Sequence, residues 1–100
     1  MHHFRYLITS LWVSGIRVPS TKGDLIVVVR NGGADIDWEL ISQSREYWDL
    51  KHDVCDLDMH GPVDELSGPA VVVRSDGRSH VFRGVGALDG FSIEASVKSD

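Results

Sequence analysis

The stretch from Gly23 to Leu40, GDLIVVVRNGGADIDWEL, constrains the fold of this chain more than any other. Its two apolar-rich halves are joined at Gly32 and Gly33, and glycine adopts the positive φ angles of a tight turn without steric cost. A turn centred on these glycines pairs apolar side chains on one face: Leu25 with Leu40, Val27 with Trp38, and Val29 with Ile36. The other face pairs Arg30 with Asp35, and Ile26 and Val28 with Glu39 and Asp37. The stretch therefore predicts a β-hairpin with one buried face.

Three other segments have the composition or the alternation of β-strands. Phe4 to Val13 is rich in aromatic and β-branched residues on both parities, which favours a central strand buried on both faces, with an N-terminal helix as the alternative. Between Asp53 and His60, apolar and polar residues alternate (Cys55, Leu57, Met59 against Asp56, Asp58, His60), which predicts a half-buried strand ending at Gly61-Pro62. Phe91 to Val97 alternates in the same way and predicts a last strand.

The segments between them are less clearly patterned. Ala70 to Phe82 predicts a second hairpin, and with Asp76-Gly77 as its two-residue turn, Val71 lies opposite Phe82 and Val73 opposite His80. Before it, Val63 to Gly68 is a polar connection, and Pro69 either opens the next strand or lies at a sheet edge. Ile41 to Leu50 fits a strand, a turn at Ser42 to Glu46 and another strand, which we prefer, or about two turns of helix.

Length and composition fit a single β domain, residues 1–100, with 42% hydrophobic and 25% charged residues. Seven or eight short strands with two tight hairpins predict an all-β fold, a compact antiparallel sandwich or small barrel. Cys55 is the only cysteine, which excludes an internal disulfide and favours a reducing, cytoplasmic location. The N-terminal apolar run is broken by Thr9 and Ser10, and no run approaches the roughly 20 residues of a membrane span, so we expect a soluble protein.

Charge is unevenly distributed along the chain. The formal net charge is −5, yet the segment from Asp35 to Glu65 holds ten acidic residues against Arg45 and Lys51, and so carries −8. A region of one sign disfavours the phosphates of nucleic acids and favours a basic protein partner.

The segment His52 to His60, HDVCDLDMH, is the one place where possible metal ligands crowd together. On a strand, His52, Asp56, Asp58 and His60 share one face, but their spacing matches no zinc motif. We therefore expect a solvated strand face, and predict neither a metal nor another cofactor.

No sequence motif indicates catalysis. His80 shares a strand face with Phe82 and is expected in the core or at its rim, although a histidine lining a cavity acts as a general acid or base when a carboxylate or substrate is in reach. Cys55 has the parity of the buried residues and is expected to be an unreactive core side chain. The glycines from Gly84 to Gly90 lack the spacing of a phosphate loop, so no catalytic residue is predicted.

Three functions remain open, and a non-catalytic role is favoured. The first is a protein-interaction domain of the inhibitor, immunity or regulatory-subunit type, binding a basic surface with Trp48 as an aromatic anchor. Its expected contact residues are Glu46, Tyr47, Trp48, Asp49, Asp56 and Asp58. The second is a small β-barrel enzyme or small-molecule binder with a cavity lined by His80 and the His52 to His60 segment. The third is a homo-oligomer assembled through edge strands.

Overall fold

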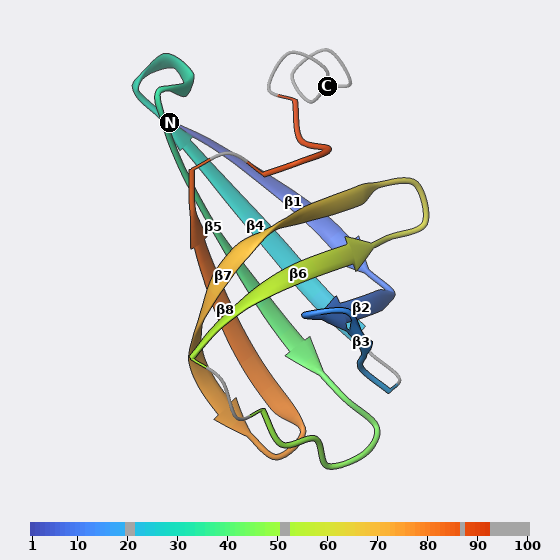
Figure 1. Cartoon of the computed structure of the whole chain (residues 1–100). Helices are drawn as coiled ribbons and strands as arrows, with labels where there is room; N and C mark the ends of the chain where they lie inside the picture. The colour runs from blue at the N-terminus through green and yellow to red at the C-terminus, as the bar shows by residue number, and fades with distance from the viewer. Residues whose placement is uncertain (20–21, 51–52, 87, 93–100) are drawn as a thin grey trace.

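The computed structural model describes residues 1–19, 22–50, 53–86 and 88–92, and it is all-β (Figure 1). It has eight strands in one antiparallel sheet, together with a three-residue 3-10 helix, η1, at Asn31–Gly33. The strands are β1 (His2–Ile8), β2 (Ser10–Val13), β3 (Ile16–Arg17), β4 (Lys22–Arg30), β5 (Asp35–Gln43), β6 (Val54–His60), β7 (Glu65–Asp76) and β8 (Ser79–Val85). The predicted fold class is confirmed.

The sheet curls so that β1 at one end and β2 near the other end are consecutive in the chain. The strand order is β1-β4-β5-β8-β7-β6-β2-β3, yet β1 and β2 are separated in the chain by Thr9 alone. β1 pairs with β4 and β2 with β6, and the Thr9 backbone N–H donates to the His60 carbonyl at 2.8 Å. The strands therefore wrap around one interior in a barrel-like arrangement, as Figure 1 shows.

The N-terminal segment is strand, as preferred over helix. It forms two strands, β1 at one end of the sheet and β2 next to β3 at the other end, rather than one central strand. Ile8 is buried in β1, whereas Leu11 and Val13 are buried in β2, so the inward parity changes at the break between the two strands. Leu7 is exposed, which corrects the prediction of two buried faces. The apolar residues alternate on two parities because β1 and β2 are separate strands, and each has its own inward-facing side.

The first hairpin has the predicted register. Val29 pairs with Ile36, Val27 with Trp38, Leu25 with Leu40 and Arg30 with Asp35. Asn31, Gly32 and Gly33 have positive φ angles of 54°, 64° and 103°, a conformation that glycine adopts readily and asparagine tolerates. The backbone N–H of Ala34 donates to the Asn31 carbonyl at 3.2 Å and closes the turn.

The second hairpin exists, but its turn lies one residue later than predicted, so the pairing is shifted by two residues next to the turn and by one residue beyond the β-bulge. Asp76 pairs with Ser79, so the two loop residues are Gly77, with φ of 65°, and Arg78, the pattern of a type II′ turn. His80 lies opposite Ser75, and Phe82 lies opposite Val72. The shift of two residues alone would keep each side chain on its face, but the bulge between Val72 and Arg74 changes the inward parity of β7, so that Val71 and Val73 are exposed.

Three further predictions are corrected. After β5 ends at Gln43, residues 44–50 form neither the second predicted strand nor a helix. β7 begins at Glu65, so Pro69 lies inside the strand, in a part that pairs with β6. Phe91 and Ser92 are not in a strand, and the rest of the strand predicted at 91–97 lies outside the described residues.

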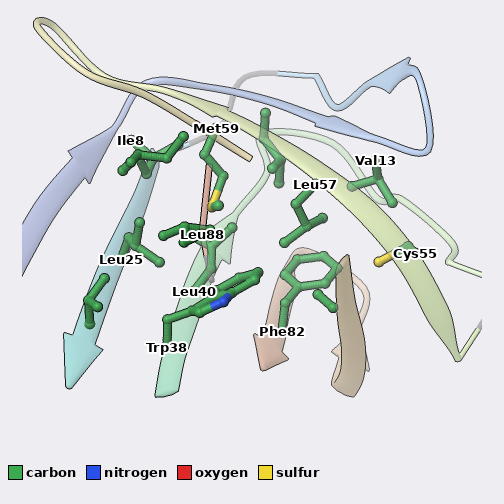
Figure 2. Close-up of a cluster of buried hydrophobic side chains, with 14 of the residues drawn as sticks. Ile8, Val13, Leu25, Trp38, Leu40, Cys55, Leu57, Met59, Phe82 and Leu88 are labelled. Carbon is green, nitrogen blue, oxygen red and sulfur yellow. The ribbon is translucent and has the colours of Figure 1, made fainter. Parts of the chain in front are cut away.

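The inner faces of the strands form one core (Figure 2). Leu57 and Met59 from β6 face Trp38 and Leu40 from β5, and Leu88 fills the space between these two sides. Phe91 packs edge-on against Phe4 at a centroid distance of 5.5 Å, so the chain after β8 contacts β1. Burial of these apolar side chains is the main source of stability for a domain of this size.

Candidate functional site

The acidic side chains of β5 have polar partners on the same outer face of the sheet. Arg30 forms an ion pair with Asp37, and Arg83 forms one with Glu39 at 3.0 Å. The side-chain amide of Asn31 donates to Asp35. The charges of Asp37 and Glu39 are therefore compensated by arginine, whereas Asp35 keeps its negative charge.

The acidic side chains of β6 are different. Asp56 and Asp58 are exposed, and neither forms an ion pair with any described residue. The same holds for Asp64 and Glu65, which follow β6 in the chain. Because β8 and β7 separate β5 from β6 in the sheet, the acidic stretch of the sequence is divided between two surfaces, and on the β6 side Asp56 and Asp58 have no ion-pair partner among the described residues.

Apolar side chains lie beside these free carboxylates. Val54 of β6 is opposite Val71 of β7, and the two are 67% and 52% exposed. Next along the same strand pair, Asp56 is opposite Pro69, and Asp58 is opposite Ser67. We define the acidic face as Val54, Asp56, Asp58, Ser67, Pro69, Val71 and Asp89.

Asp89 joins this face from the segment after β8. Its backbone exchanges two hydrogen bonds with Ser67, at 2.8 and 3.0 Å. Asp56, Asp58 and Asp89 line one shallow hollow of about 230 Å³. The sequence did not indicate Asp89, because it lies beyond the acidic stretch and reaches the face only through this backbone pairing.

The four weak metal candidates do not form a site in the described structure. His52 lies outside the described residues. Asp56, Asp58 and His60 share the outer side of β6, but the His60 ring packs against Trp12 at 4.5 Å. Among the residues described, no three His, Cys, Asp or Glu side chains are placed to hold a metal ion.

The segment with the other four predicted contact residues, Glu46 to Asp49, lies against the β7–β8 turn. The Trp48 backbone N–H donates to the Gly77 carbonyl at 3.0 Å, and its half-buried indole packs edge-on against His80 at 4.7 Å. Tyr47 is the more exposed aromatic residue, at 73%. Glu46 and Asp49 are exposed.

His80 is fully buried beside other polar side chains. Its Nδ1 is 2.8 Å from the Ser75 hydroxyl, and its Nε2 has no hydrogen-bond partner among the described residues. Burial lowers the pKa of the imidazole, and a hydrogen bond with the Gly77 backbone raises it by less. The ring is therefore held neutral, and within the described part of the chain no hydrogen bond or ion pair joins it to a carboxylate that would orient it as a catalytic base.

Cys55 has the environment of a core thiol. It is buried with Leu57 and Met59, and burial, followed by the negative charge of Asp56, raises the pKa of the thiol. A raised pKa keeps the sulfur protonated and disfavours nucleophilic chemistry at this position.

Fold and surface together define an all-β domain with an acidic face on β6 and β7. Comparison of the chain with models of known families, with curated proteins and with solved structures gives no match. Within the described ranges, no helix has the length and apolar character needed to cross a bilayer.

Proposed function

We propose that this domain is a non-catalytic interaction domain whose acidic face binds a basic surface of a partner protein. The observation that carries the proposal is the exposed Val54–Val71 pair next to Asp56 and Asp58, which have no ion-pair partners among the described residues. An inhibitor, an immunity factor or a regulatory subunit would use such a surface.

Each part of the face has a physical role in this proposal. The adjacent valines and Pro69 offer apolar area that gains free energy when a partner removes it from water. The carboxylates of Asp56, Asp58 and Asp89 repel acidic proteins and attract basic ones, which raises the rate of encounter. Apolar contact and charge complementarity together favour one class of partner, a protein with a basic patch.

Residues 46–49 supply a second part of the contact in this proposal. An apolar hollow of about 370 Å³ is lined by Asp49, Trp48 and Cys55 together with the β2–β3 turn. The Ser14 hydroxyl of that turn accepts a hydrogen bond from the Asp56 backbone N–H at 3.4 Å, so this hollow borders the acidic face. Tyr47 is the exposed aromatic side chain of this segment, and the lone Cys55 favours a cytoplasmic setting.

The test is capture of partners from the native source, followed by association kinetics of the captured protein at two salt concentrations. The variant carries Asp56→Lys and Asp58→Lys, and a control with the same change in charge carries Asp35→Lys and Asp37→Lys on β5. We expect a basic partner whose on-rate falls about tenfold in the β6 variant, and far less in the control. The on-rate should also fall as salt rises.

Three results would contradict the proposal. They are an acidic partner, an on-rate that does not change with salt, and an equal loss in the two charge-reversal variants. Thermal unfolding of all the proteins shows whether each variant is folded, and exposed positions such as Asp56 and Asp58 should tolerate lysine.

A further inference from the structure

The basic residues of this acidic chain divide into two groups. Eight of the ten lie in the described residues. Four of these form ion pairs with carboxylates: Arg5, Arg30, Arg74 and Arg83. The other four, which have no ion pair with a described residue, are Arg17, Lys22, Arg45 and Arg78.

Three of the four bases without a carboxylate partner line one hollow. Arg17 ends β3, Lys22 begins β4, and Arg45 lies two residues after β5, so they are distant in sequence. They meet in a hollow of about 700 Å³, whose other polar residues are Thr9, Gln43 and Ser44. No acidic side chain among the described residues lines it, and we call it the basic hollow.

The fourth such base, Arg78, belongs to the same end of the sheet. Its backbone carbonyl accepts a hydrogen bond from the Ser44 N–H at 2.8 Å. Lys22 and Gln43 are direct partners across β4 and β5, so their side chains lie on the same side of the sheet. The positive charges of Arg17, Lys22, Arg45 and Arg78 at this end of the sheet repel one another, and a bound anion would reduce this repulsion.

Ser44 lies beside the basic hollow with its hydroxyl buried. The residue lines the basic hollow but is only 7% exposed, and its Oγ has no hydrogen-bond partner among the described residues. Two other buried polar atoms without partners, Ser42 Oγ and His80 Nε2, belong to residues that face each other across β5 and β8 at this end. Buried hydroxyl groups without partners are uncommon, because each loses its hydrogen bonds to water without replacement.

We propose that the basic hollow binds a small organic phosphate. The guanidinium groups of Arg17 and Arg45 match the oxygens of a phosphate in pairs, and Lys22 adds a third positive charge. A volume of about 700 Å³ is within the range of small-molecule sites and exceeds what a single phosphate group fills. This site is independent of the acidic face, because the two share no residue.

Isothermal titration calorimetry of the full chain with inorganic pyrophosphate tests the proposal. The measurement is made at low ionic strength, where the Debye length exceeds about 10 Å. We expect saturable binding at one site, weakened about tenfold by Arg45→Gln and by Lys22→Gln.

The matched control is Arg74→Gln, which removes the same charge outside the hollow. Arg74 is exposed and paired with Asp76 at 3.2 Å, so its replacement should change the affinity by less than about twofold. The absence of saturable heat would overturn the proposal, and so would an equal loss of affinity in Arg74→Gln. A parallel titration with citrate distinguishes the ligand chemistry, and binding of citrate in preference to pyrophosphate would overturn the assignment to phosphate.

Discussion

His80 shows how one buried residue depends on several strands. Its ring lies between Trp48, at 4.7 Å, and Phe82, at 6.5 Å, while the Ser75 hydroxyl from β7 is within hydrogen-bond distance of Nδ1. These neighbours exclude water but supply no negative charge, so the charged imidazolium is disfavoured. The sequence predicted correctly that His80 shares a strand face with Phe82. The residue predicted opposite His80, Val73, was wrong, because Ser75 lies there.

Lowering the pH from about 7 to about 5 should reduce the free energy of unfolding. The folded-state pKa of His80 lies below its ordinary value of 6.5, so the unfolded chain takes up a proton first as the pH falls. This loss begins near pH 6.5 and stops once the pH is below the folded-state pKa. Urea unfolding at several pH values should show a smaller slope for His80→Gln than for the wild type.

The control for this prediction is His60→Gln. His60 is half-buried on the outer side of β6, so its replacement should leave most of the pH dependence in place. Equal slopes in wild type and His80→Gln would show that His80 does not cause the effect.

The sequence did not indicate that the residues of the basic hollow lie together. Arg17, Lys22 and Arg45 belong to segments with no common pattern, and only the pairing of strands brings them to one hollow. Ser44 falls in a stretch where polar residues suggested an exposed turn. Its burial depends on the β7–β8 turn, whose Arg78 carbonyl accepts its backbone N–H.

The two hairpins show when a register can be predicted at the scale of the element. In the first, Ile36, Trp38 and Leu40 alternate with Asp35, Asp37 and Glu39, so the sequence decides which face of this strand is buried. In the second, Ala70 to Val73 is apolar on both parities, and the turn residues alone had to decide. Because Gly77 suits either position of a two-residue turn, the turn was placed one residue too early, which shifted the predicted pairing next to it by two residues.

Gly84 of β8 leaves room for the indole of Trp38 on the neighbouring strand β5, and Gly84→Ala should destabilise the domain by about 1–3 kcal/mol. A Cβ atom there would overlap the indole of Trp38, which lies opposite in the ladder and is buried. Chemical unfolding should show the loss, while Val85→Ala, at an exposed neighbouring position, should have little effect.

A second substitution separates crowding from other causes. Trp38→Phe makes room beside Gly84, so adding it to Gly84→Ala should cost less than the sum of the two single variants. Simple additivity, or a neutral Gly84→Ala, would refute the close contact.

At the scale of the whole molecule, charge along the sequence differs from charge on the surface. The sequence count from Asp35 to Glu65 treats ten acidic residues as one region. In the folded chain, Arg30 and Arg83 come from other segments to pair with the acids of β5, and the acids of β6 lie elsewhere in the sheet. A count along the sequence cannot include residues that become neighbours only through folding. The predicted contact residues therefore included Asp56 and Asp58 of β6 but not Asp89.

Closure of the sheet depends on the segment after β8, and Leu88→Ala is the last prediction. Leu88 is buried in the centre of the core, and Asp89 and Phe91 hold this segment against β7 and β1 (Figure 2). Truncating a buried leucine costs about 2–5 kcal/mol, a large part of the roughly 5–15 kcal/mol that stabilises a domain. Urea unfolding followed by tryptophan fluorescence should therefore show a much lower midpoint, whereas Leu7→Ala, on the exposed side of β1, should unfold close to the wild type. If the two variants were equally stable, the segment would not complete the core, and the strands alone would account for the fold.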